Sequence, residues 1–415
     1  MKINKHTLDN GLRIVHVEDK STQMVTLNIL YKVGSRNEDL EHTGFAHLFE
    51  HLMFGGSVNI PDYDTPLQLA SGDNNAFTTS DYTNYYLTVP SVNVETGFWL
   101  ESDRMLSLAF TPESLEVQRK VVMEEFKQHY ITPPYGDLQH LMSSLAYKVH
   151  PYRWPTIGLK LEHIENVQME EVKSFFYRFY APNNAILSVV GNLNFEDTVR
   201  LSEKWFGNIP SRDIDSAPIP QEPEQTEERR MIVKREVPSD VLYMSFPIVG
   251  VTHKDFHCSD MISDILSVGR SCRLNKHLVE EQHLFTELDA FVIPRLDPGQ
   301  LCIVGSPAEG VSIDEAEAGV WKELELLCSD GISDTELEMV KNKFETNFMR
   351  DRQRRNKLAA QLAFYEMLGD AEWAEHEIEG YRSVTKAEFM DVCRKTLKRE
   401  KVSVLHYLSS SKDCH

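Results

Sequence analysis

One stretch of the chain, residues 211–228, differs sharply in composition from the segments on either side. It contains three prolines among aspartate, glutamate and glutamine residues, which is typical of an exposed linker. The stretch divides the 415 residues into two halves, and each is long enough to bury a core of its own. We therefore expect a domain at 1–212, a linker at 213–228 and a second domain at 229–415.

Apolar patterns predict the same order of strands and helices in both halves. In the first half we expect strands at 12–17, 25–33 and 184–191, a hairpin at 77–89, and helices at 44–54, 94–104, 112–130 and 169–180. In the second half we expect strands near 241–246, 301–304 and 402–407, and helices at 256–268, 313–327, 334–368 and 386–397. The repeated order indicates an α+β fold of two homologous domains, each a mixed or antiparallel β-sheet flanked by helices.

The charge balance limits the partners of the chain. The formal net charge is −21, so nucleic-acid phosphates and anionic membrane surfaces would repel it. No apolar run is long enough to span a bilayer, and the N-terminus lacks the apolar stretch of a signal peptide. We therefore expect no nucleic-acid or membrane partner and a cytoplasmic location, or a periplasmic one if the chain has already been processed.

Six cysteines occur, all of them in the second half of the chain and none with CxxC spacing. This distribution does not fit a disulfide scaffold or a zinc finger. The cysteines are expected to be small buried apolar residues.

The clearest chemical signal is His47-Leu-Phe-Glu50-His51. On a helix, positions i, i+3 and i+4 share one face, so His47 and His51 can present ring nitrogens to one metal ion. Glu50 lies beside them. Catalytic zinc takes three protein ligands and leaves one position open, so one further ligand is needed. The competing interpretation is an ordinary amphipathic helix with two surface histidines.

Several further motifs occur in a fixed order around this one. They are residues 42–54, Asn75-Ala76-Phe77-Thr78 with Thr83 and Tyr85, residues 150–158 beginning His-Pro-Tyr, and residues 180–191 beginning Tyr-Ala-Pro-Asn-Asn-Ala. Together they resemble the pitrilysin-type zinc peptidases, the M16 family, over most of the chain. The resemblance implies the LuxS/MPP-like metallohydrolase fold.

The resemblance also implies a third zinc ligand on a later helix. Val121-Val-Met-Glu124-Glu125 offers two candidates, and the family ligand matches the second, Glu125. Glu124 is the alternative, and the pair could instead be a solvated helix surface. The family often has a glutamate at the position of Gln118, which can hydrogen-bond but cannot carry charge.

Two further elements of the family handle substrate. Asn75 and Ala76 match the strand edge to which peptides add as an extra strand, although Asn75 could instead cap a turn. Arg273 matches an arginine that grips the peptide, but the accompanying tyrosine position falls at Thr286. Arg273 could therefore make a structural ion pair instead.

The resemblance implies a zinc endopeptidase with one Zn²⁺ per chain, bound by His47, His51 and Glu125, and with Glu50 as general base for the zinc-bound water. Unfolded peptides would be cut inside a clamshell chamber. Because the arginine–tyrosine pair is incomplete, we expect a heterodimer with a second M16 chain that supplies it, with a homodimer as the second possibility. The alternatives are a peptidase for targeting presequences and a non-catalytic assembly subunit.

Overall fold

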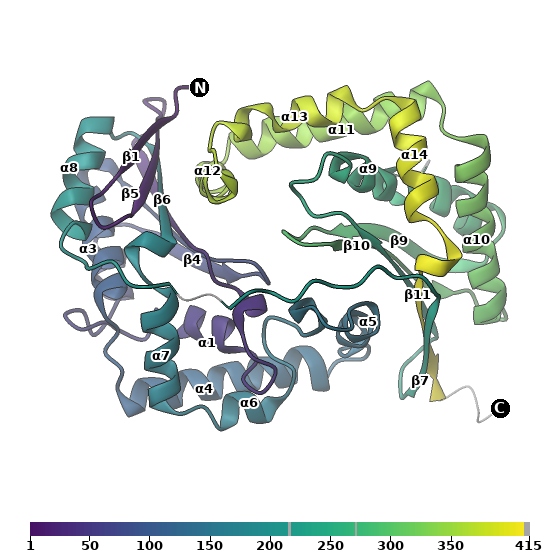
Figure 1. The fold of residues 1–415 in the computed structure, drawn as a ribbon, viewed down its shortest axis with the longest axis horizontal. Helices are drawn as coiled ribbons and strands as arrows, with labels where there is room; N and C mark the ends of the chain where they lie inside the picture. The colour runs from purple at the N-terminus through teal and green to yellow at the C-terminus, as the bar shows by residue number, and fades with distance from the viewer. Residues whose placement is uncertain (215–216, 270–271, 411–415) are drawn as a thin grey trace. The chain divides into compact units, whose positions relative to one another are not determined.

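The structure, a computed structural model, describes residues 1–214, 217–269 and 272–410 and divides into two compact units (Figure 1). Neither unit is continuous in the chain. Unit 1 comprises Met1–Lys127, Trp154–Ile219 and Phe348–Glu377, and unit 2 comprises Gln128–Arg153, Pro220–Asn347 and Ile378–His415. Each unit thus contains one segment from the other half of the chain. The domain boundaries expected from the sequence are continuous ranges and do not include these two segments.

Unit 1 is built on a six-stranded sheet with the order β1-β2-β6-β3-β5-β4. Its strands are β1 (Asn4–Thr7), β2 (Arg13–Glu18), β3 (Met24–Tyr31), β4 (Asp73–Thr78), β5 (Thr83–Pro90) and β6 (Ala185–Gly191). The β2 and β6 strands pair parallel, and the other neighbours pair antiparallel. The sheet is therefore mixed, as expected.

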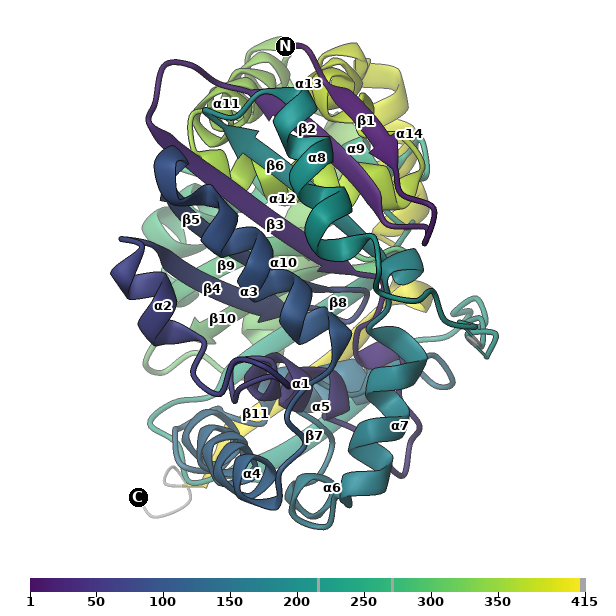
Figure 2. The same cartoon turned by 90° about the vertical axis from the view of Figure 1, so that its left-hand side faces the viewer.

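The helices of unit 1 cover both faces of this sheet. They are α1 (Phe45–Leu52), α2 (Asp64–Leu69), α3 (Val94–Leu106), α4 (Pro112–Phe126), α6 (Leu161–Glu165), α7 (Met169–Phe179), α8 (Phe195–Phe206) and α12 (Arg355–Leu368). Leu27 of β3 faces α3, where a Cβ at Gly97 would come within 3.5 Å of its methyl groups. Three residues on, Leu30 points to the opposite face and packs with Leu358 and Leu362 of α12. Figure 2 shows α3 and α8 in front of the sheet and α12 behind it.

Unit 2 has a five-stranded sheet with the order β7-β11-β8-β10-β9. Its strands are β7 (Arg229–Arg235), β8 (Val241–Ile248), β9 (Phe285–Ile293), β10 (Gly299–Pro307) and β11 (Ser403–Ser409). The β7 and β11 strands pair parallel and the others antiparallel. This is the order of the first sheet without its β1 strand, so the two units share one topology.

The helices of unit 2 again cover two faces. They are α5 (Leu138–Ala146), α9 (Phe256–Ser267), α10 (Ile313–Asp330) and α14 (Lys386–Thr396), with a π-helical turn at η6 (Asn275–Glu281). Tyr243 of β8 packs with Met142 and Leu145 of α5. Phe246, three residues further along the strand and so on the other face, packs edge-to-face on Trp321 of α10.

Two helices are exchanged between the halves of the chain. The α12 helix follows α11 (Asp334–Arg352) in the second half but packs in unit 1, and α5 lies in the first half but packs in unit 2. The prediction of a single helix at 334–368 is therefore wrong. It breaks between Arg352 and Arg355, so that the Leu358, Ala359 and Leu362 face can cover the sheet of unit 1.

Other details also differ from the expectation. The first strand of the hairpin begins at Asp73, earlier than expected, and α4 ends at Phe126, where a π-helical turn, η3 (Lys127–Ile131), continues it. The α8 helix and α13 (Trp373–Ser383) were not anticipated. No helix in the described part of the chain is both long and apolar enough to cross a membrane.

Candidate metal centre

The helix that carries the HxxEH motif, α1, begins at a special position. Gly44, its N-cap residue, has φ of 93°, and a Cβ there would lie 2.6 Å from the carbonyl oxygen of Ile157. Only glycine fits such a place. Glycine has no side chain to cap the helix, and the carboxylate of Glu38 takes that role by accepting from the N–H groups of Gly44 at 2.9 Å and Ala46 at 2.8 Å.

The two faces of α1 have different partners. Phe49 is fully buried and stacks on Phe175 of α7, with ring centroids 5.0 Å apart. The opposite face carries His47, Glu50 and His51, all of them partly exposed. The apolar face therefore anchors the helix and leaves the motif side chains facing outward from the core.

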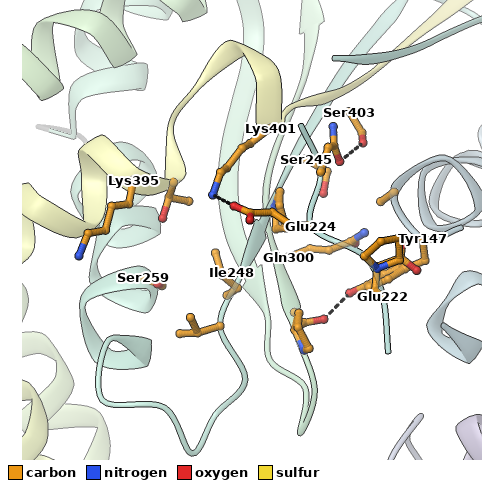
Figure 3. Close-up of a pocket in the computed structure, with 18 of the residues that line it drawn as sticks. Tyr147, Glu222, Glu224, Ser245, Ile248, Ser259, Gln300, Lys395, Lys401 and Ser403 are labelled. Atoms are coloured by element: carbon orange, nitrogen blue, oxygen red, sulfur yellow. Dashed lines mark hydrogen bonds and ion pairs between the residues drawn. The ribbon is translucent and has the colours of Figure 1, made fainter. Parts of the chain in front are cut away.

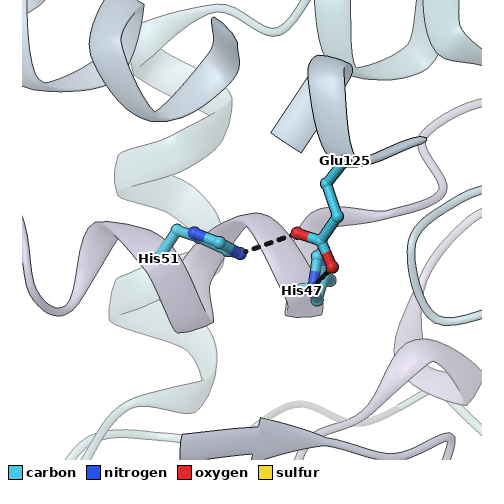
Figure 4. A group of neighbouring side chains, drawn as sticks. All are labelled: His47, His51 and Glu125. Atoms are coloured by element: carbon cyan, nitrogen blue, oxygen red, sulfur yellow. Dashed lines mark ion pairs between the residues drawn. The ribbon is translucent and has the colours of Figure 1, made fainter. Parts of the chain in front are cut away.

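The structure brings His47, His51 and Glu125 together (Figure 4). The Nε2 atom of His47 lies 3.6 Å from Oε1 of Glu125, and Nε2 of His51 lies 3.3 Å from Oε2. All three ligand atoms fall within 4.8 Å of one another. Ligand atoms bound about 2.0–2.1 Å from a tetrahedral zinc lie roughly 3.4 Å apart, so the residues present fit such an ion.

The α4 helix distinguishes the two candidate glutamates. It starts as expected, with Thr111 accepting from the N–H of Ser114 at 3.1 Å and with Pro112 in the first turn. Glu125 faces the two histidines. The side chain of Glu124 is 61% exposed and lies 3.8 Å from Nζ of Lys127. Geometry thus favours Glu125 as the third ligand.

The protonation of His51 suits a metal ligand. Burial lowers the pKa of His51 below its ordinary value, while the neighbouring Glu125 acts in the opposite direction. A lowered pKa favours the neutral imidazole near neutral pH, which is the form that binds a metal ion.

Glu50 is positioned by a residue of β4. The hydroxyl of Thr78 donates to Oε2 of Glu50 at 2.5 Å. Burial raises the pKa of Glu50, the hydrogen bond from Thr78 opposes this, and the nearby charge of Glu125 adds to it. A carboxylate with a raised pKa beside a metal site is suited to accept and return a proton.

The β4 strand is an edge of its sheet, because among the described residues it pairs with β5 alone. Asn75 is exposed, and its side-chain oxygen accepts from the N–H of Ala76 at 2.8 Å. Asn75 therefore holds a backbone donor of its own strand. A peptide that pairs with this edge would replace that hydrogen bond.

Arg273 lies in unit 2, away from the motif in sequence, and it is engaged. Its guanidinium donates to Glu336 at 2.8 Å and to the carbonyl oxygen of Gly331 at 2.7 Å. Thr286 is exposed and donates to the carbonyl oxygen of Ser306. Residues 270 and 271 of the motif around Arg273 lie outside the described residues. A role for Arg273 in substrate binding stays a prediction.

Two residues of the site were not anticipated from the sequence. Thr78 stands in one of the motifs, but only the tertiary structure brings it to Glu50. A weak signal could have indicated Glu38 as the cap of α1: it is an acidic residue shortly before a helix that begins after a glycine.

A second group of possible ligands, Asp314, Glu317 and His406, occurs in unit 2. Arg230 donates to both carboxylate oxygens of Glu317 at 2.8 Å. This group already contains its own cation and does not resemble a metal site.

Two sheets of one topology, and in unit 1 two histidines and a glutamate on α1 and α4 that could hold a metal ion, define a two-domain α+β protein with a candidate metal centre. Two family models match the sequence. "Insulinase (Peptidase family M16)" matches residues 13–158, and "Peptidase M16 inactive domain" matches residues 166–344. The chain belongs to the M16 peptidase family.

Similar proteins point to the same class. The chain is 29% identical to the "Zinc protease PqqE" of Helicobacter pylori over 370 residues, 88% of this chain and 83% of that protein. It is 25% identical to the "Uncharacterized zinc protease YmxG" of Bacillus subtilis, with 84% of each chain covered. A solved structure of a protease from Helicobacter pylori matches with a TM-score of 0.92 at 26% identity, over 98% of this chain and 99% of that one. These names support a metallopeptidase.

Proposed function

We propose that the protein is a zinc metalloendopeptidase that hydrolyses unfolded peptides, with Glu50 as general base. The observation that carries the proposal is the convergence of His47, His51 and Glu125 beside Glu50. Zinc held by these three ligands, one ion per chain, would supply a Lewis acid that polarises a carbonyl and acidifies water.

The residues of the chain have separate roles in the reaction. Glu50, on the same turn as His51, accepts a proton from the attacking water and later donates it to the leaving amine. Thr78 holds the carboxylate of Glu50 through its hydroxyl, which fixes the position of this base beside the two histidines. The raised pKa of Glu50 helps it to retain the proton between the two transfers.

The free edge of β4 is proposed to bind the substrate as an added strand. Asn75 and Ala76 lie on this edge, and β4 also carries Thr78. Main-chain pairing of this kind tolerates many sequences but requires an extended peptide. An unfolded substrate follows from this requirement, and a chamber formed with a second chain would reinforce it.

A second M16 chain is proposed as partner. Arg273 is bound by Glu336 and the Gly331 carbonyl, and Thr286 stands where a tyrosine is expected. These two positions are therefore poorly suited to grip a peptide. A partner chain that supplies an arginine and a tyrosine would complete the site, and a homodimer is the second possibility.

The test compares the purified chain with Glu50→Gln, using zinc analysis and a library of quenched fluorescent peptides. Both proteins should hold about one zinc per chain, and the variant should lose at least about 100-fold in kcat/KM. Glu124→Gln is the matched control, since Glu124 is an exposed neighbour on α4, and it should behave as wild type.

Three outcomes bear on the proposal. Absence of zinc binding after zinc is supplied would overturn it, as would full activity in Glu50→Gln. If zinc binds but the wild type cuts no peptide, addition of a candidate partner chain should restore cleavage.

A further inference from the structure

The start of α1 packs against a short stretch of unit 1, residues 157–165, which ends in α6 and is called the α6 segment below. A Cβ at Gly44 would lie 2.6 Å from Cδ1 of Ile164. The residue before Gly44, Thr43, is fully buried, and its hydroxyl accepts from the N–H of Leu159 at 2.7 Å. The α6 segment therefore contacts the two residues from which α1 begins.

His163 of the α6 segment binds Thr43 through one ring nitrogen. The N–H of Thr43 donates to Nδ1 of His163 at 3.3 Å, and the hydroxyl of Thr43 lies 2.8 Å from the same atom. A backbone amide can only donate, so Nδ1 carries no proton and the hydroxyl is a second donor to it. The ring is therefore neutral, with its proton on Nε2.

Protonation of His163 would change this contact. It would place an N–H on Nδ1, opposite the N–H of Thr43. The hydroxyl of Thr43 can turn to accept from the new N–H, since its oxygen has two lone pairs, but the backbone amide cannot reverse. The amide of a fully buried residue would lose its acceptor, which is unfavourable. Protonation of this one ring therefore loosens the residue that precedes the start of α1.

The surroundings of His163 favour its neutral form near neutral pH. Burial lowers the pKa of His163, and among the neighbouring charges Lys160 lowers it while Glu41 raises it. The side chain is partly exposed, so a proton can reach it in acid. The other titratable groups on the elements around it are Glu162 on α6, His42 with its partner Glu171, and the ion pair of Glu116 with Arg119 on α4.

The proposed zinc ligands begin one helical turn after this contact. His47 is four residues beyond Thr43, and the same helix carries Glu50 and His51. A shift at residue 43 would move the first turn of α1, and a metal site needs its ligands held to within about 0.5 Å. The contact between His163 and Thr43 is therefore placed to act on the metal centre.

We propose that His163 is a positioning residue of the metal centre. Its neutral form accepts from Thr43 and holds the start of α1, and its protonated form releases it. Zinc affinity should then fall in acid by more than the protonation of His47 and His51 causes. The inference rests on the zinc site of the proposed function and adds a pH-dependent support to it from outside the ligand set.

His163→Asn separates the hydrogen bond from the titration, because an asparagine oxygen can accept as Nδ1 does but takes up no proton. Calorimetric zinc titrations should give equal affinities for wild type and variant at about pH 8. At about pH 5 the wild type should bind about threefold to tenfold more weakly than the variant. His163→Leu, which has no acceptor, should show a loss of this size at both pH values. Circular dichroism shows whether each variant is folded.

His253→Asn is the matched control. Nδ1 of His253 accepts from the N–H of Asp255, the N-cap residue of α9, so it makes the same kind of contact at the start of a helix in unit 2. Asp255 lines a cavity of about 430 Å³ in unit 2 (Figure 3), and none of the proposed zinc ligands does. This variant should keep the zinc affinity of the wild type at both pH values.

Nuclear magnetic resonance of protein with isotope-labelled histidine tests the assigned tautomer. The ring signals that disappear in His163→Asn are those of His163. At about pH 8 they should show a protonated Nε2 and an unprotonated Nδ1. A proton on Nδ1 at that pH would overturn the proposal.

The proposal is also wrong if wild type and His163→Asn lose zinc affinity equally in acid, or if His253→Asn removes the loss as well as His163→Asn does. Hydrogen exchange of residues 43–48 in metal-free protein gives a readout without zinc. After correction for intrinsic rates, the wild type should exchange about threefold to tenfold faster than His163→Asn at about pH 5, and equal rates would overturn the proposal. None of these measurements needs peptide cleavage, so the expected pattern in a chain that cuts no peptide would refute the proposed function alone.

Discussion

Equivalent helices of the two units show how one scaffold carries two different kinds of site. The β3 and β8 strands hold the same place in their sheets, and α1 and α9 are the first α-helices after them. The α4 and α11 helices are likewise each the second α-helix after β5 and β10. The α1 and α4 helices of unit 1 are therefore structurally equivalent to α9 and α11 of unit 2.

The side chains at these places differ in charge. The α1 helix presents His47 and His51, four residues apart, to the carboxylate of Glu125. The α9 helix presents Asp260 and Asp264, also four residues apart, and Nζ of Lys343 on α11 donates to both carboxylate oxygens of Asp264 at 2.8 Å. Tyr381 donates to Asp260 at 2.7 Å.

The two clusters differ in whether they contain a cation of their own. Two neutral imidazoles and one carboxylate leave a cluster of lone pairs that an external cation can bind. In unit 2 the ammonium of Lys343 already supplies the cation and pairs with the carboxylate of Asp264. The same pair of helices thus carries a candidate metal site in unit 1 and a structural ion pair in unit 2.

The largest effect expected from this comparison is on zinc binding. Glu125→Ala removes the only carboxylate of the cluster and should weaken zinc affinity by at least about 100-fold, since even loss of a residue that only supports a ligand costs 10–100-fold. Competition with a chromophoric chelator measures it. Glu124→Ala and Lys343→Met should leave affinity unchanged, and the assignment is wrong if Glu124→Ala is the variant that loses zinc.

The next largest effect concerns the ion pair of unit 2. Lys343→Met leaves the Asp264 carboxylate, whose side chain is 10% exposed, without its cation. We expect the free energy of unfolding to fall by about 1–2 kcal/mol, less than for a fully buried pair because the lysine side chain is 35% exposed. Urea denaturation measures it. Adding Asp264→Asn should restore most of the loss, and no recovery would mean that the lysine acts through packing alone.

A smaller effect is expected at Asp260, where burial raises the pKa to about 6. Because an unfolded aspartate has a pKa of about 3.9, the folded state binds this proton more tightly. Its contribution to stability is present below about pH 4 and is lost as pH rises through about 6. Asp260→Asn should therefore stabilise the protein by about 1 kcal/mol at about pH 7 and not at about pH 4. Thermal unfolding at both pH values checks this, and equal effects at both would contradict the cause.

The smallest effect is expected on the pKa of Glu50, the proposed general base in unit 1. Thr78→Val removes the hydroxyl that lowers the pKa of Glu50, so that pKa should rise. The acidic limb of the kcat/KM profile should move to higher pH, and kcat should fall about threefold to tenfold. Thr78→Ser, which keeps the hydroxyl, should behave as wild type. An unshifted limb in Thr78→Val would show that the hydrogen bond does not tune Glu50.

Local features of the site were open to prediction from the sequence. The HxxEH spacing on a helix, the start of α4 at Pro112 behind Thr111, and the end of the β6 strand at Gly191 all follow from nearby residues. The family resemblance supplied Glu125, whose carboxylate lies beside the two histidines, and its role as a ligand stays a prediction. The contact between Thr78 and Glu50 could not be predicted from nearby residues, because it joins a strand to a helix 28 positions away.

The sequence by itself determined the composition of each element, the common α+β order of the two halves, and the residues that can bind a metal. Tertiary structure alone decided the exchange of α5 and α12 between the units and the break in the helix expected at 334–368. An apolar helix face predicts that the helix packs against another element, but it does not predict which sheet face that element presents. Which face does so depends on packing across the whole chain, and that same packing placed Lys343 rather than a metal ion beside Asp264.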